Sequence, residues 1–273
     1  MFTEYVQSWK RHNPTWEYKL WTDEDNRALV ATHYPEFLQA YDGFKHGIMR
    51  ADFVRYLYMH HHGGLYADLD MECLKPMDTL MSTHMVVLAR MGTNDSFSHS
   101  VPNAFMASVP GHPFWKFCIA TSLMRWMVQL TLQEGVWYGP ESITGPVVLK
   151  DAVDVYQEFH RENAPARGRL TILPAGTIYP VDWKALLDAQ AQIKLGLPLS
   201  EDAMWMEQCL QMNETLYNRA SCQKAVTEHV PWAHAVTYWS HRRNLRGPSD
   251  HPKAAHRRRC WSGRGPLEDV HRG

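Results

Sequence analysis

Two carboxylates separated by one residue, Asp68 and Asp70, are the side chains of this sequence best placed to do chemistry. They follow Leu65-Tyr66-Ala67, where apolar and polar residues alternate, so Tyr66, Asp68 and Asp70 are expected on one face of a strand. Carboxylates at this spacing can hold a hard divalent cation, and Mn²⁺ or Mg²⁺ fits the oxygen ligands. A cation held there would neutralise a departing diphosphate, which is the difficult part of transferring a sugar from an activated donor.

The segment before this strand has a helical period. Apolar residues recur at three- and four-residue steps between Gly47 and His62, and Gly63-Gly64 then supplies a stop signal. Asp52 and Arg55 are three residues apart, so they share one face of the helix. Helix, Gly-Gly turn and strand form an α/β unit, and ligands usually bind at the carboxyl ends of strands in open α/β sheets.

The remaining pattern alternates helices with short strands, which favours an α/β fold. The pattern predicts a helix N-cap at Thr22-Asp23 and another at His112, before Pro113. Helices are expected over 3–12, 24–31, 113–130 and 147–160, the third of them buried, and strands over 17–21, 85–89, 170–173, 178–179 and 235–239.

Length and composition suit one large domain or two closely packed subdomains, with 273 residues of which 45% are hydrophobic. The formal net charge is -1, but residues 241–273 hold nine Lys or Arg against three Asp or Glu. We expect a catalytic domain over 1–240 and a basic, disordered tail over 241–273. No apolar run is long enough to span a membrane, and the N-terminus lacks a signal-peptide core. Cys209 and Cys222 lie close enough in sequence to pair in an oxidising compartment.

Several motifs resemble those of one family in the same order. The stretches Arg50 to Leu57 and Gly63 to Asp70, followed by Glu72-Cys73-Leu74-Lys75-Pro76, resemble the DXD sugar-binding region of glycosyltransferase family 32. That family includes yeast initiating α-1,6-mannosyltransferases and the mannosyltransferases of inositol phosphorylceramide. Further resemblance to the second group is found in residues 100–108, 110–115, 144–146, 178–180 and 235–241. The resemblance therefore covers roughly residues 5 to 241.

The resemblance implies a GT-A-like, Rossmann-related mixed sheet flanked by helices, and a reaction that retains the anomeric configuration. Two departures stand out: the chain begins after the family's usual opening strand, so a missing first strand is expected, and Ser240-His241-Arg242-Arg243 replaces the usual Ser-His-Ser-Trp ending. By residue match, the catalytic candidates are Asp68 and Asp70, the metal candidates are Asp70, Asp68 and His241, and the donor-sugar candidates are Asp52, Arg55, Tyr66, Gly64 and Gly145.

The implied partners are a nucleotide-diphosphate sugar donor and a glycolipid acceptor resembling inositol phosphorylceramide, or another glycan. Nucleic acid is not expected as a partner. The family resemblance implies a Golgi or secretory membrane location, with membrane association through an absent anchor or weakly through the basic tail.

Three other interpretations of the motif stay open. One is a catalytically degenerate, transferase-like binding module, favoured by the two departures. A second is a transferase of galactose or N-acetylglucosamine from a UDP-sugar. A third, a phosphotransferase of the haloacid-dehalogenase type, is disfavoured because Glu72 stands where that motif needs Thr or Val.

Some conspicuous polar residues are expected to be structural. His60, His61 and His62 cannot converge on one ion from a regular helix, because successive side chains point about 100° apart. Glu72 is expected to pair with Lys75 on the surface. Glu141 and Thr144, in a loop bracketed by Gly and Pro, face an acceptor or cap a turn.

Overall fold

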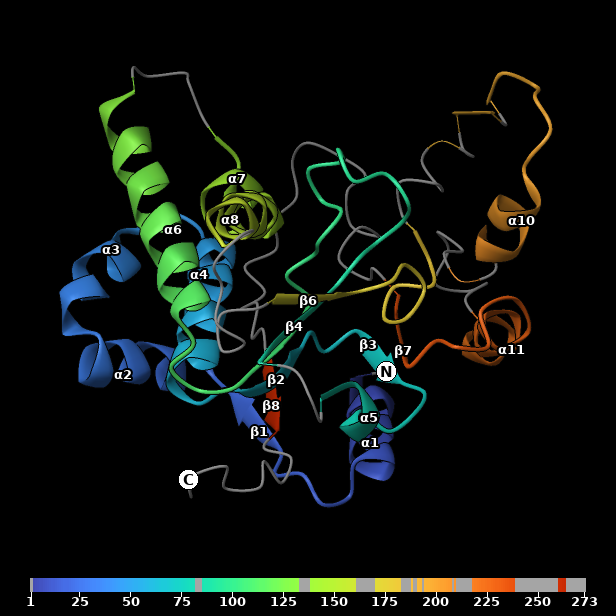
Figure 1. Ribbon diagram of the computed structural model, residues 1–273, viewed down its shortest axis with the longest axis horizontal. Helices are drawn as coiled ribbons and strands as arrows, with labels where there is room; N and C mark the ends of the chain where they lie inside the picture. The colour runs from blue at the N-terminus through green and yellow to red at the C-terminus, as the bar shows by residue number, and fades with distance from the viewer. Residues whose placement is uncertain are drawn as a thin grey trace, which may run out of the picture.

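The structure is a computed structural model that describes residues 2–81, 85–132, 138–160, 170–182, 188, 191–192, 194–207, 209, 218–238 and 260–263. Figure 1 shows two groups of helices on either side of a central sheet. The helices are α1 (Phe2–His12), α2 (Asp23–His33), α3 (Leu38–Gly43), α4 (Gly47–His61), α5 (Asp78–Met81), α6 (Pro113–Thr131), α7 (Pro140–Ile143), α8 (Pro146–Phe159), α10 (Glu201–Glu207) and α11 (Arg219–His229), with a 3₁₀ turn at Pro35–Phe37.

The central sheet has six strands in the order β1-β8-β2-β5-β4-β6. All neighbours pair antiparallel except β4 and β6, which are parallel, so the sheet is mixed. A second sheet holds only β3 and β7, antiparallel. The strands are β1 (Lys19–Trp21), β2 (Gly64–Ala67), β3 (Met71–Cys73), β4 (Val86–Ala89), β5 (Phe105–Ser108), β6 (Leu170–Leu173), β7 (Ala235–Thr237) and β8 (Cys260–Gly263).

Both faces of the central sheet are buried at β2, β4 and β5, because successive side chains point to opposite faces and each face meets its own core. From β2, Leu65 and Ala67 enter a core shared with α1, β3, β7 and α11. Tyr66, between them, enters a second core shared with α2, α4, α6 and α8. The predicted class, a mixed α/β sheet flanked by helices, is confirmed.

Local sequence signals explain several element boundaries. The side chain of Thr22 accepts a hydrogen bond from the N–H of Asp25, and the Asp25 carboxylate accepts one from the N–H of Thr22, which is a capping box at the start of α2. His112 accepts a hydrogen bond from the N–H of Phe114 and caps α6, as predicted. Gly63 has φ of 63°, and a Cβ there would lie 2.7 Å from the carbonyl oxygen of Ser108, so only glycine suits this turn.

The strand predicted to run through Asp70 ends earlier, at Ala67. The N–H of Met71 donates to the carbonyl of Asp68 at 3.1 Å, and the triplet forms a turn between β2 and β3. The turn is needed because β3 leaves the central sheet and pairs with β7. The expectation that all three polar side chains extend one regular strand face is therefore wrong.

The predicted buried helix and the predicted strand at 178–179 differ from expectation, and four residues of the segment expected as a tail are described. The helix predicted over 113–130 forms, but its buried residues lie between Phe114 and Ser122, while Met127 and Leu130 in its second half are exposed. Of the tail expected to be disordered, the structure describes 260–263, which form β8 between β1 and β2. The strand predicted at 178–179 is an isolated parallel bridge between Met91 and Tyr179. Within the described residues, no helix is long and apolar enough to cross a membrane.

Candidate functional site

Helix α4 places an acidic and a basic side chain near the carboxyl end of β2. Asp52 and Arg55 are both buried, and their side chains form an ion pair with 2.9 Å between Oδ1 and Nη2. The i, i+3 spacing places them on one helix face, as the sequence predicts. Two buried charges need compensation, and in this pair each compensates the other.

Arg55 also joins the helix to the DXD triplet. Its Nη1 lies 3.4 Å from Oδ1 of Asp68, and its guanidinium carbon lies 4.7 Å from the centre of the Tyr66 ring. The Tyr66 hydroxyl donates to the same oxygen of Asp68. Arg55 therefore lies between Asp52 and Asp68, so α4, β2 and the turn after it form one polar cluster.

Asn103 completes this cluster and was not singled out from the sequence. Its carbonyl oxygen accepts a hydrogen bond from Arg55 Nη1 at 2.7 Å, and its side-chain amide donates to Asp52 Oδ1 at 3.3 Å. Asn103 precedes β5, the neighbour of β2, and it lies within the family-like stretch 100–108. That position beside a site strand is the signal that could have identified it.

Gly145, at the start of α8, approaches the same cluster. A Cβ at this position would lie 3.1 Å from Oδ2 of Asp52 and 2.8 Å from the Cα of Glu141. The Gly145 carbonyl also accepts a hydrogen bond from the Tyr56 hydroxyl on α4, at 3.1 Å. The structure therefore brings Gly145 to Asp52, whereas Gly64 lies at the far end of β2 from Asp68, with φ of 79°.

Asp70 lies in the same turn as Asp68, two residues further along the chain, and is 7% exposed. Tyr179 is buried close to both acids of the triplet. Burial raises the pKa of Tyr179 well above its ordinary value, and the neighbouring Asp68 charge raises it further. Tyr179 therefore stays protonated and donates to the carbonyl of Pro102 at 3.2 Å.

The carboxylates of the cluster suit a divalent cation. Among the described residues, Asp52 and Asp68 pair with Arg55, and Asp70 adds a third carboxylate in the same turn as Asp68. Mg²⁺-like ions commonly bind through one or two carboxylates together with substrate phosphates. Asp68 and Asp70 suit that donor set, although the described residues contain no cluster of three His, Cys, Asp or Glu around a possible ion. His241 lies outside the described residues.

Three of the polar residues expected to be structural, His60, Glu141 and Thr144, contact other side chains or the backbone of the protein. His60 Nδ1 is 2.7 Å from the Tyr34 hydroxyl, in the packing between α2 and α4. Glu141 pairs with His99 at 3.0 Å, while the Thr144 hydroxyl donates to the carbonyl of Pro140 at 3.4 Å.

Glu72 does not pair with Lys75 on the surface. It is fully buried, and its carboxylate forms an ion pair with Arg219. The local spacing suggested Lys75, but the side chain of Glu72 points into the core shared with α11, where Arg219 is its cationic partner.

Comparison with known proteins supports the motif assignment. Residues 1–87 match the family described as glycosyltransferase sugar-binding region containing DXD motif. This match contains Asp52, Arg55, Tyr66, Asp68 and Asp70. The expected resemblance to this family is confirmed.

The relatives include fungal mannosyltransferases. The chain is 41% identical over 102 residues to inositol phosphoceramide mannosyltransferase 3 of Schizosaccharomyces pombe, covering 37% of this chain and 27% of that protein. Inositol phosphoceramide mannosyltransferase 2 of the same organism is 34% identical over 153 residues, covering 52% of this chain and 42% of the relative. The chain thus spans less than half the length of these relatives. Among solved structures, PaToxG glycosyltransferase aligns over 74% of this chain and 58% of that chain, at 16% identity with a TM-score of 0.31.

Proposed function

Because residues 1–87 contain the DXD sugar-binding region of a glycosyltransferase family, we propose that this chain is a metal-assisted hexosyltransferase. It transfers a hexose, mannose in our proposal, from a nucleotide-diphosphate sugar with retention of configuration. The acceptor is a glycolipid like inositol phosphorylceramide, the lipid after which these two relatives are named. The observation that carries the proposal is Arg55, which links Asp52 on α4 to Asp68 in the triplet.

The donor hexose is recognised by the side chains of Asp52 and Arg55, which Asn103 holds in place. Asp52 accepts hydrogen bonds from sugar hydroxyls, and Arg55 donates to sugar oxygens from a fork held by the Asn103 carbonyl. Burial strengthens these contacts, since the local dielectric is low and the partners are already oriented. Gly145 lets the start of α8 pack directly against Asp52, since a Cβ there would lie only 3.1 Å from Oδ2 of this acid.

Asp70 and Asp68 hold the divalent ion, with Asp68 also facing the ribose or sugar. When bound, the ion supplies positive charge that offsets the charge of the departing nucleoside diphosphate. The protein keeps Asp68 oriented for this role through Tyr66 and Arg55. A GT-A-like arrangement and a secretory location of the whole protein are part of the same proposal.

Turnover of the donor tests this function. Purified chain with Mn²⁺ and detergent-dispersed inositol phosphorylceramide is given GDP-mannose or, separately, UDP-galactose or UDP-N-acetylglucosamine, and nucleotide release and glycolipid product are measured. We expect GDP-mannose to be consumed, and Asp70→Asn to slow release by at least about 100-fold, the scale of losing one charge-stabilising group.

The control is Asp154→Asn, on the exposed face of α8, where the lost partner is Lys150. This variant should turn over donor at the wild-type rate. Turnover with a UDP-sugar alone would replace mannose in the proposal. No turnover of any donor, or turnover unchanged by EDTA, would reject a metal-assisted transferase.

A further inference from the structure

The backbone at Asp70 is fixed by the smaller sheet. The carbonyl of Asp70 accepts a hydrogen bond from the N–H of Tyr238, at 3.2 Å, which extends the β3–β7 ladder by one residue. The next carbonyl, of Met71, accepts one from Trp9 Nε1 of α1 at 3.0 Å. Asp68 is fixed differently, through Arg55, Tyr66 and the carbonyl of Ala104 on the side of β5.

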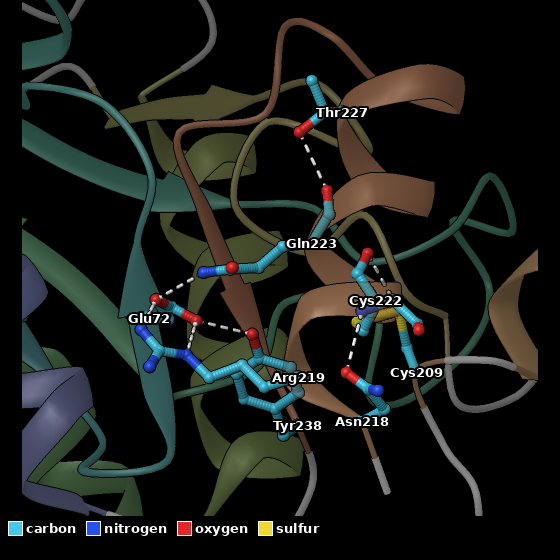
Figure 2. The surroundings of a disulfide bond; sticks show 9 residues. Glu72, Cys209, Asn218, Arg219, Cys222, Gln223, Thr227 and Tyr238 are labelled. Carbon is cyan, nitrogen blue, oxygen red and sulfur yellow. Dashed lines mark hydrogen bonds and ion pairs between the residues drawn. A yellow bond between two sulfur atoms is a disulfide. The ribbon is translucent and has the colours of Figure 1, made fainter.

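Glu72, two residues after Asp70, is the centre of the side-chain contacts in this region (Figure 2). One carboxylate oxygen accepts hydrogen bonds from Arg219 Nη2 and from Gln223 Nε2, the latter at 2.7 Å. The other accepts from Arg219 Nε at 2.9 Å and from the Tyr238 hydroxyl at 2.6 Å. A bidentate Arg fork and two neutral donors satisfy a carboxylate that is otherwise costly to bury.

Tyr238 therefore holds the strand after the triplet at two points. Its N–H contacts the backbone of Asp70, and its hydroxyl contacts the side chain of Glu72. Its ring is buried and stacks on Tyr5 of α1, with 5.0 Å between ring centres.

Arg219 brings a more distant element into the same arrangement. It begins α11, the helix that the Cys209–Cys222 disulfide attaches to the chain before it, as Figure 2 shows beside Glu72. Arg219 also pairs with Glu4 of α1, at 2.6 Å. The two ion pairs of Arg219 thus connect three elements, α1, β3 and α11.

We propose that Glu72 and Arg219 are positioning residues that set the place of Asp70 relative to Asp68, and so the affinity of the site for its divalent cation. The inference rests on the proposed function, in which Asp70 and Asp68 hold the ion. The two carboxylates are anchored to different parts of the molecule, Asp68 to α4 and β5, and Asp70 to Tyr238 after β7, whose hydroxyl and Arg219 of α11 both bind Glu72. A variant that disrupts the Glu72–Arg219 ion pair therefore shifts Asp70 and leaves Asp68 in place.

Mn²⁺ binding to the chain alone, without nucleotide, tests this inference. Free Mn²⁺ is measured by electron paramagnetic resonance during a titration of wild type, Glu72→Gln, Arg219→Lys and Arg219→Met. Outer partners of metal ligands typically contribute about 10- to 100-fold in metal affinity. We expect the Mn²⁺ dissociation constant to rise at least about tenfold in Glu72→Gln and Arg219→Met, and by less in Arg219→Lys, which keeps the charge but not the fork.

The control variant is Arg27→Met. It removes an exposed Arg from an ion pair with Asp42 at 2.7 Å, away from the triplet, and should leave the Mn²⁺ constant unchanged. Melting temperatures of all variants show whether a changed Mn²⁺ constant comes from a destabilised fold or from a displaced Asp70. A lower melting temperature with an unchanged Mn²⁺ constant in Glu72→Gln and Arg219→Lys would overturn the proposal, because it would make the ion pair structural only.

If Arg219→Met does not fold, Arg219→Lys still decides the test, because this variant leaves a cationic partner for the buried Glu72 carboxylate. Mn²⁺ binding too weak to measure in the wild type would also overturn the inference. A shifted Mn²⁺ constant in a chain that turns over no sugar donor would reject the proposed function and leave the positioning role standing.

Discussion

Gly145, the N-cap residue of α8, packs against Asp52, the acid proposed to bind the donor sugar. Any side chain there meets Asp52 and the backbone of Glu141. Overpacking of this kind typically costs about 1–3 kcal/mol, so we predict that Gly145→Ala weakens binding of GDP-mannose roughly tenfold. Calorimetric titration of the sugar nucleotide in the presence of Mn²⁺ measures the change.

Gly139 provides the matched control, because a Cβ there would meet nothing within 4 Å and its φ of -60° suits alanine. Gly139→Ala should bind donor as the wild type does. Equal affinity in Gly145→Ala and wild type would show that the packing of Gly145 against Asp52 does not affect donor binding.

Residues of the site could be predicted where their geometry is local. Asp52 and Arg55 share a helix face because they are three apart, and the structure pairs them. Asn103 reaches the same acid from 51 residues away along the chain, and Glu72 finds Arg219 across 147 residues. No periodicity relates residues so far apart, so these partners depend on how the sheet orders its strands.

At the scale of elements, α2 and α4 pack through a titratable contact. Burial lowers the pKa of His60, and the neighbouring Lys116 charge lowers it further, while burial raises the pKa of Tyr34 to about 12. The neutral imidazole lies 2.7 Å from the Tyr34 hydroxyl. The folded chain thus favours neutral His60, and the unfolded chain protonates this residue near its ordinary value of 6.5.

This difference predicts a loss of stability in acid. As the pH falls below about 6.5, the unfolded state takes up a proton that the folded state still excludes, so the free energy of unfolding decreases. In urea titrations at about pH 7.5 and about pH 5.5, His60→Gln should lose less stability than wild type over this interval. The same loss in both proteins would mean that His60 is not responsible, leaving His12 and His234, whose pKa values burial also lowers, to account for it.

Element boundaries followed the sequence where a capping or turn residue specifies them, as at Thr22, His112 and Gly63. The end of β2 could not be predicted in this way. The alternation of polar and apolar residues continues through Asp70, but β3 pairs with β7, a strand more than 160 residues later in the chain. The turn at the triplet is thus a consequence of the tertiary fold and not of local preference.

At the scale of the whole molecule, two groups of helices lie on either side of the central sheet (Figure 1), and the site draws on both. The group with α4 and α8 holds Asp52, Arg55 and Gly145, and the elements of the other group, with β7, hold the backbone of Asp70. Cys209 and Cys222, whose pairing the sequence alone does not decide, form a disulfide in the second group of elements. Disulfides persist in oxidising compartments, which supports the secretory location in our proposal.

The central claim is that the Asp68-Leu69-Asp70 turn binds a nucleotide through a divalent ion. Calorimetric titration of the wild-type chain with GDP, and separately with UDP, in Mn²⁺ and again in EDTA tests it most directly. We predict that GDP binds in Mn²⁺ and that binding is lost in EDTA. Binding that is the same with and without the ion, or no binding of either nucleotide, would contradict the account.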